Sequence, residues 1–148
     1  MISFLLSVGV PSAVARDAVP CEIKITTPQP GDKVGEEGEV GGTAKIPGGT
    51  YLWVLSHRKN LSADWWPQGM HAAAIDADGK WVVVSAYGRA KDVGKQFEVA
   101  AVAVDGETNT KLREWFKTAK ERDYPPIEFP DAVGGCVPVK VTVNKTSH

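Results

Sequence analysis

The sequence predicts a mainly β fold, an antiparallel β-sandwich of about seven strands with one α-helix inserted before the last strand. Three observations lead to this prediction. Short apolar or alternating segments recur along the chain, with Gly, Pro and Asp turn signals between them. One late segment has helical periodicity instead. The two cysteines, Cys21 and Cys136, stand just before the first strand-like segment and at the start of the last one, which indicates one domain whose ends are joined by a disulfide.

The strands at the two ends of the chain are predicted from alternation. Ile23 and Ile25 alternate with polar residues, and this segment ends at Pro28. In the last segment the alternating positions are all valine, and Pro138 between them places its open N–H position towards a sheet edge. Strands are therefore predicted to begin at Ile23 and to cover residues 39–46, 51–55, 72–75, 81–86, 97–104 and 137–143.

Turn residues and unbroken apolar runs define the middle strands. The adjacent Gly41 and Gly42 indicate a bulge or a close backbone approach within the second strand. Residues 51–55 are continuously apolar, which is typical of a central strand, with Trp53 as the expected core anchor. Asp-Gly at the end of residues 76–79 is a tight-turn signal and predicts a hairpin between the flanking segments.

The one predicted helix has an apolar face spaced at i, i+3, i+4 and i+7. That face consists of Leu112, Trp115, Phe116 and Ala119. Residues 108–110 supply N-cap candidates, and the Pro-containing residues 123–126 end the helix. Its outer positions are mostly charged, which is typical of a solvated face and also allows docking of an acidic partner.

Composition and charge limit the class of protein. The 148 residues are 43% hydrophobic and 24% charged, and 17 basic against 18 acidic residues give a formal charge of −1. This length predicts a single globular domain. The balanced charge favours neither nucleic acid nor an anionic membrane as partner.

The first fifteen residues predict a signal peptide, which leaves residues 16–148 as one domain. Residues 2–10 are apolar, Pro11 follows, and Ala13-Val14-Ala15 resembles a cleavage site. The run is shorter than the about 20 residues needed to cross a bilayer. No Lys or Arg precedes it, so an upstream start or an ordinary buried strand stays open as an alternative. We expect a secreted or periplasmic location.

Export also agrees with the cysteines, because disulfides persist outside the reducing cytosol. A lipid-anchored Cys21 is an alternative to the Cys21–Cys136 disulfide. It is disfavoured by Pro20, which stands where a lipidation motif has a small residue.

The arrangement of seven short strands with a late helix points to an immunoglobulin-like sandwich. Its core and turn motifs follow one another in a recognisable order: Tyr51-Leu52-Trp53-Val54, Trp65-Trp66-Pro67-Gln68-Gly69, Asp78-Gly79-Lys80-Trp81 and Phe97-Glu98-Val99. This order resembles bacterial extracytoplasmic immunoglobulin-like or fibronectin-type-III-like modules over residues 21–145. The resemblance implies a fold, an extracytoplasmic location and a binding, adhesion or spacer role, but no functional residue.

The segment from Trp65 to Gly69 is the strongest candidate for ligand binding. Two adjacent tryptophans cannot both point inward from an extended chain, and an exposed indole stacks on sugar rings or on aromatic and proline-rich partners. Alternatively, the tryptophans cap the open end of the sandwich. With the polar residues nearby, the candidate ligand-binding residues are His57, Arg58, Trp65, Trp66, Gln68 and His71.

No catalytic, cofactor or metal motif is present in the sequence. His57 and His71 lack a short ligand spacing, and Asp76 with Asp78 lacks the further oxygen ligands of a calcium loop. A Gly-x-Ser-x-Gly elbow is also missing. We therefore expect a non-catalytic binding module without cofactor or metal. We expect its ligand to be a carbohydrate or cell-wall polymer that binds through an exposed Trp loop; the alternative is a structural or protein–protein interaction domain that has no small ligand and docks through the helix and an edge strand.

Overall fold

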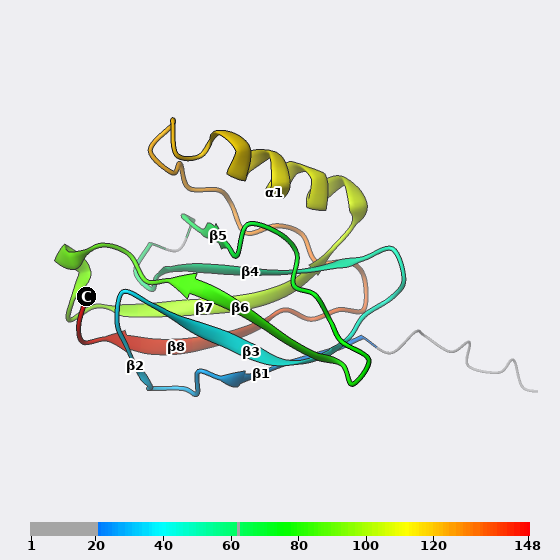
Figure 1. Cartoon of the computed structure of the whole chain (residues 1–148), viewed down its shortest axis with the longest axis horizontal. Helices are drawn as coiled ribbons and strands as arrows, with labels where there is room; N and C mark the ends of the chain where they lie inside the picture. The colour runs from blue at the N-terminus through cyan, green and yellow to red at the C-terminus, as the bar shows by residue number, and fades with distance from the viewer. Residues whose placement is uncertain (1–20, 62) are drawn as a thin grey trace, which may run out of the picture.

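The computed structural model describes residues 21–61 and 63–148, which form two β-sheets and one α-helix (Figure 1). The predicted signal peptide lies outside the described residues. One sheet has the order β1-β3-β6, with β1 at Glu22–Thr27, β3 at Glu37–Lys45 and β6 at Lys80–Ala86. The other has the order β2-β8-β7-β4-β5, with β2 at Lys33–Val34, β8 at Val139–Lys145, β7 at Gln96–Val104, β4 at Tyr51–Arg58 and β5 at Trp66–Gln68.

The pairing between neighbouring strands is antiparallel except between β2 and β8, which run parallel. Helix α1 (Gly106–Thr118) lies between β7 and β8 in the chain, and a short 3₁₀ helix, η1 (Ala90–Asp92), precedes β7. Figure 1 places α1 above β4 and β5, at the opposite side of the molecule from β1. The prediction of a mainly β protein with a helix before the last strand is confirmed.

The main core lies between the two sheets. It contains buried residues from both, including Val40, Leu52, Val54, Trp81, Val83, Val99 and Val143. Strand β6 alternates strictly between exposed and buried side chains, as expected for a strand with one solvated face. The five-stranded sheet behaves differently, because its two central strands are covered on both faces.

A second core lies on the far face of β4 and β7, under α1. Trp53 and Leu55 of β4 pack there with Leu112 of the helix. Trp53 is fully buried, and its indole Nε1 donates a hydrogen bond of 2.9 Å to Asn109 Oδ1. This second core explains why residues 51–55 are continuously apolar, and it confirms Trp53 as a core anchor.

The two adjacent glycines of β3 approach different strands, Gly41 the backbone of β6 and Gly42 that of β1. The register of β1 against β3 shifts between Ile25 and Thr27, so this pair of strands contains the predicted irregularity. A Cβ on Gly42 would overlap the carbonyl of Lys24. Glycine at position 42 therefore allows β1 and β3 to pair without a gap.

The predicted hairpin is wrong in its first arm. Residues 72–75 are not a strand; Ala73 N donates to Leu52 O at 2.7 Å, and Ile75 packs against the main core. The turn itself is present, since Asp76 Oδ1 accepts hydrogen bonds from the backbone of Asp78 and Lys80. Apolar residues that pack against a core beside a sheet resemble a strand in sequence without being part of the ladder.

The helix presents the predicted face to the protein but begins earlier than expected. Its N-cap is Asp105, whose carboxylate accepts a hydrogen bond of 2.8 Å from Thr108 N, so the expected cap within residues 108–110 is wrong. This hydrogen bond lowers the pKa of Asp105. Leu112, Trp115 and Ala119 are buried as predicted. Of the described helices, none is long and apolar enough to cross a membrane.

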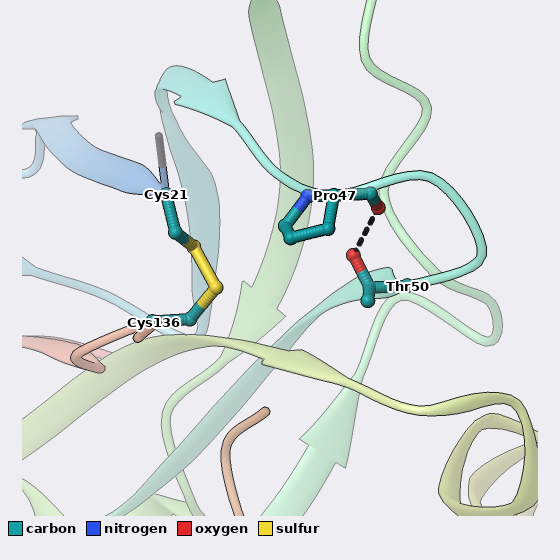
Figure 2. Close-up of a disulfide and its surroundings, with 4 residues drawn as sticks. All are labelled: Cys21, Pro47, Thr50 and Cys136. Atoms are coloured by element: carbon teal, nitrogen blue, oxygen red, sulfur yellow. Dashed lines mark hydrogen bonds between the residues drawn. A yellow bond between two sulfur atoms is a disulfide. The ribbon is translucent and has the colours of Figure 1, made fainter. Parts of the chain in front are cut away.

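The last strand begins at Val139, and Val137 before it is 80% exposed. Strand β8 pairs with β7 from Val139 to Asn144, but with the two-residue strand β2 only at Asn144 and Lys145. In the described residues, the end of β8 next to Pro138 therefore has a ladder partner on one side only, in agreement with the expected position of Pro138 towards an edge. The disulfide between Cys21 and Cys136 is present, with the two Cα atoms 5.1 Å apart. Figure 2 shows it beside the turn in which Thr50 Oγ1 donates to Pro47 O.

Candidate functional site

A cleft of about 720 Å³ opens where three segments distant in sequence meet. These segments are β5 with the end of β4, the connection from β6 to β7 (residues 86–92), and the chain after α1 (residues 123–126). The volume lies within the about 300 to 1,000 Å³ that is usual for small-ligand sites. We call it the Trp66 cleft, because Trp66 lies on its wall.

The apolar wall of the Trp66 cleft is aromatic. Trp66 is partly exposed and Tyr124 is 48% exposed. The Trp66 indole Nε1 donates a hydrogen bond of 2.7 Å to Tyr124 O, which fixes the orientation of the ring. Trp115, Phe116, Pro67 and Pro126 complete the apolar lining. The cleft therefore offers aromatic surface that is held in place before any ligand arrives.

The backbone that holds Tyr124 is strained. Asp123 and Tyr124 have φ angles of 55° and 48°, in the left-handed region that residues other than glycine seldom adopt. Tyr124 N donates to Ala119 O at 2.7 Å, and the Asp123 carboxylate lies 3.2 Å from Arg89 Nη2. Conformations of this kind cost free energy and are found preferentially at functional sites.

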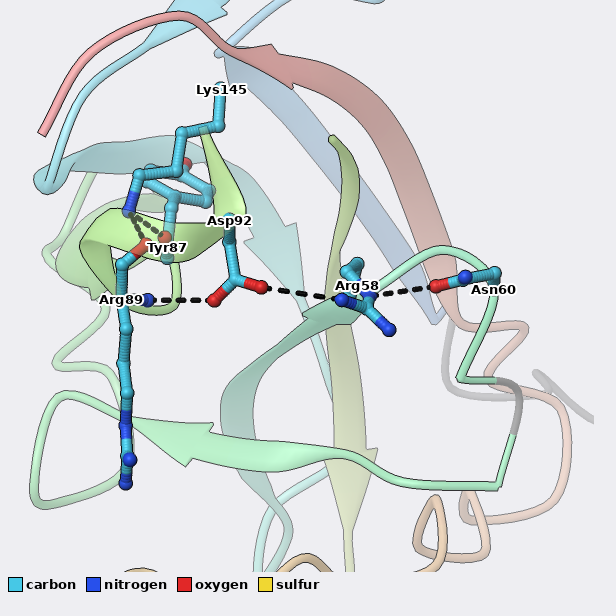
Figure 3. Close-up of polar contacts among 6 residues, drawn as sticks. All are labelled: Arg58, Asn60, Tyr87, Arg89, Asp92 and Lys145. Carbon is cyan, nitrogen blue, oxygen red and sulfur yellow. Dashed lines mark hydrogen bonds and ion pairs between the residues drawn. The ribbon is translucent and has the colours of Figure 1, made fainter. Parts of the chain in front are cut away.

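The polar lining is organised around Asp92 (Figure 3). This residue is 8% exposed; Oδ2 accepts a hydrogen bond of 2.8 Å from Arg89 N, and Oδ1 lies 3.3 Å from Arg58 Nη1. Arg58 Nε also donates to Asn60 Oδ1 at 2.8 Å. These contacts fix both the Arg58 guanidinium and the backbone turn that follows β6.

Lys145 supports the same turn from the interior. Its ammonium donates hydrogen bonds to Tyr87 O (2.6 Å) and Arg89 O (2.9 Å), and the residue is 1% exposed. Burial lowers the pKa of Lys145, opposed by the charges of Asp92 and Glu36. The turn between β6 and β7 is thus tied to the last strand.

The other side of the cleft is fixed by Gln68 and Ser56. Gln68 Oε1 accepts from Ala86 N at 2.8 Å, its Nε2 donates to Trp66 O at 3.1 Å, and Ser56 Oγ donates to Ala86 O at 3.0 Å. Gly88 (φ 66°) passes so close to Asp92 that no side chain fits there. The cleft wall is therefore a rigid junction between the two sheets.

Four of the six residues predicted to bind ligand line this cleft: His57, Arg58, Trp66 and Gln68. His57 contributes little free surface, because its side chain is 2% exposed and its ring nitrogens lie 2.9 Å from Leu61 O and 2.9 Å from Glu98 Oε1. His71 is exposed outside the lining residues.

The tryptophan pair divides between core and cleft. Trp65 is 2% exposed; its ring stacks on His57 with centroids 3.5 Å apart and contacts the edge of Phe129 at 4.9 Å. Trp65 thus caps the second core, whereas Trp66 lies in strand β5 at the cleft. One tryptophan of the pair is therefore buried and the other is partly exposed, as expected from their adjacent positions in an extended segment.

Arg89, Asp92 and Tyr124 were not among the sequence candidates, although they line the cleft. Each lies outside the β-strands, where no periodic pattern marks a residue. The only sequence signal near Tyr124 was the proline pair that ends the helix. Within the described residues, no three His, Cys, Asp or Glu side chains come together as a metal site.

Tyr87, the first residue after β6, makes the stability of the fold depend on pH. It is fully buried, and burial raises its pKa to about 12 from 10.0. A raised folded-state pKa means that this contribution to stability is complete below pH 10.0 and is lost as the pH rises towards about 12. Between these pH values, we expect the free energy of unfolding to fall by about 2 kcal/mol more in the wild type than in Tyr87→Phe. Urea unfolding at several pH values checks this, and equal losses would contradict it.

In comparisons with known proteins, no protein-family model and no curated protein matches the sequence.

Proposed function

We propose that the protein is a non-catalytic, extracytoplasmic binding module of immunoglobulin-like architecture, and that the Trp66 cleft binds a carbohydrate such as a glycan or cell-wall polymer. The observation that carries the proposal is the pairing of a fixed, partly exposed indole with ordered polar side chains in one cleft. The apolar face of a sugar ring packs on an aromatic face, while its hydroxyls need a few well-placed donors and acceptors.

The strand order supports the immunoglobulin-like part of the proposal. In that fold, strands A, B and E share one sheet and C, F and G share the other. Here β1, β3 and β6 would take the places of A, B and E, and β4, β7 and β8 those of C, F and G. The disulfide supports an extracytoplasmic location, although it joins the segments before β1 and β8 and not strands B and F.

Tryptophan fluorescence tests the proposal, because the protein has five tryptophans and only one of them is partly exposed. The other four, Trp53, Trp65, Trp81 and Trp115, are at most 8% exposed. Acrylamide should therefore quench mainly Trp66, and a bound glycan should protect it. We expect Trp66→Ala to weaken glycan binding by more than about tenfold, as for aromatic residues at the centre of binding sites.

Val137→Ala is the control for this experiment, since Val137 is 80% exposed and does not line the cleft. It should leave both quenching and affinity unchanged. If a panel of cell-wall and plant glycans neither protects Trp66 nor distinguishes Trp66→Ala from the wild type, the carbohydrate proposal is wrong.

Protein recognition at β6 is the second candidate function. Strand β6 is an edge of the three-stranded sheet, and its Val82 and Val84 are 58% and 50% exposed. An exposed edge strand with apolar side chains can accept a strand from a partner. Val84→Lys should abolish such pairing without affecting glycan binding in the Trp66 cleft.

A further inference from the structure

The Trp66 cleft has an excess of positive charge. Its lining contains the cations Arg58, Arg89 and Lys91 against the carboxylates Asp92 and Asp123, and the Lys145 ammonium lies directly behind the turn. The whole chain has a formal charge of −1, so this excess is local. A cleft of this kind attracts an anionic ligand.

Of the two carboxylates, Asp92 is fully engaged. It is 8% exposed and its two oxygens contact Arg58 Nη1 and Arg89 N. It also faces the charge of Lys145. Asp92 therefore balances charges inside the protein, and within the part of the chain that the structure describes the Arg89 guanidinium pairs with an exposed carboxylate instead. Figure 3 shows the Arg89 side chain extended away from Asp92.

The partner of the Arg89 guanidinium is Asp123, and this pair is exposed. The two side chains are 65% and 85% exposed, with Nη2 and Oδ1 3.2 Å apart. Ion pairs at such positions contribute little stability, so a ligand carboxylate can replace Asp123 at low cost. A guanidinium also binds a carboxylate through two parallel hydrogen bonds.

Arg89 and the Trp66 ring are held by adjacent residues. Asp123 contacts Arg89, and the next residue, Tyr124, accepts the hydrogen bond from the Trp66 indole. The strained backbone at Asp123 and Tyr124 thus places a guanidinium and an aromatic ring at the same end of the cleft. A sugar that carries a carboxylate has one chemical group suited to each of them: the ring for the indole and the carboxylate for the guanidinium.

We propose that the ligand of the Trp66 cleft is an acidic glycan, in which a uronic acid ring packs against Trp66 while its carboxylate binds the Arg89 guanidinium in place of Asp123. This inference rests on the proposed function, because it specifies the class of carbohydrate.

The test compares a galacturonic acid trimer with its methyl ester, which has the same rings without the charge. By calorimetry near pH 7 and at low salt, we expect the free acid to bind about tenfold more tightly than the ester. Raising NaCl from about 0.05 M to about 0.5 M should weaken binding of the acid and leave the ester nearly unchanged.

Two variants at the cleft have opposite expected effects. Arg89→Gln should remove the preference for the acid, whereas Asp123→Asn should strengthen acid binding several-fold because it removes the competing carboxylate. Asparagine tolerates the left-handed backbone at this position. Lys117→Gln is the matched control, since Lys117 is also 65% exposed and ion-paired, with Glu114 on α1; it should change nothing.

The possible failures are distinguishable. Equal binding of acid and ester, both lost in Trp66→Ala, overturns the acidic ligand but leaves the proposed function intact. Absence of binding by either sugar, together with failure of the wider glycan panel, overturns both proposals. Binding of a triglutamate peptide as tight as that of the free acid, and equally sensitive to Arg89→Gln, overturns the requirement for a sugar ring and indicates an acidic peptide.

Discussion

Replacing both cysteines with alanine is expected to lower the free energy of unfolding by about 4 to 5 kcal/mol. The disulfide between Cys21 and Cys136 joins residues 115 positions apart. Without it, the unfolded chain gains conformational entropy, which favours unfolding. Cys136 is also 3% exposed and belongs to the main core. Urea unfolding of wild type and the double variant measures the difference.

Reduction of the wild type by dithiothreitol is the control for this prediction. Reduced wild type and the double alanine variant should unfold at nearly the same urea concentration. A difference from oxidised wild type of less than about 1 kcal/mol would contradict the assignment of the disulfide as the main constraint on the two ends of the chain.

Trp53→Ala is expected to lower the free energy of unfolding by about 3 to 5 kcal/mol. Trp53 is fully buried, stacks on Phe116 with centroids 6.0 Å apart, and hydrogen-bonds Asn109, which is itself 7% exposed. The substitution leaves a cavity between β4 and α1 and removes the hydrogen-bond partner of a buried amide.

The matched control is Trp66→Ala, the same replacement at a partly exposed site. It should cost clearly less stability than Trp53→Ala in the same urea experiment, although it weakens glycan binding by more than about tenfold. If the two variants were destabilised equally, Trp66 would be a core residue and the cleft would lose its aromatic wall.

The parts of the fold that could be predicted from sequence are those with a regular period. Val141 and Val143 in β8 alternate cleanly, and Leu112 with Trp115 marks one face of α1. The unbroken apolar run of β4 indicated burial on both faces. In each case the pattern of side chains along one segment is sufficient, because it reflects burial directly.

The parts that could not be predicted depend on partners distant in sequence. Strand β5 has only three residues, and it is a strand because it pairs with residues 54–56 of β4, which lie about twelve positions earlier in the chain. Residues 72–75 have a strand-like composition but are not a strand, and Ala73 and Ile75 pack against the main core. No local pattern distinguishes these two outcomes.

The same limit applies to the candidate site. Trp66 could be selected because two adjacent tryptophans cannot both point inward from an extended segment, and Gln68 because it is a polar residue beside them. Arg89, Asp92 and Tyr124 could not, since connections between strands and helices bring them to the cleft. The alternation of apolar and polar residues identifies strands, but it does not show which of the connecting segments lie next to each other in the folded protein.

The central claim is that the Trp66 cleft binds a glycan, and the most direct measurement is an ¹⁵N NMR titration that follows the indole N–H signals. The galacturonic acid trimer and its methyl ester serve as ligands, on wild type and Trp66→Phe. The account predicts that the Trp66 indole signal moves, together with the backbone amides of residues 86–92 and 123–126, while the indole signals of Trp53, Trp65 and Trp81, which do not line the cleft, stay in place. Shifts confined to β6 or α1, or no shifts with either sugar, would contradict it.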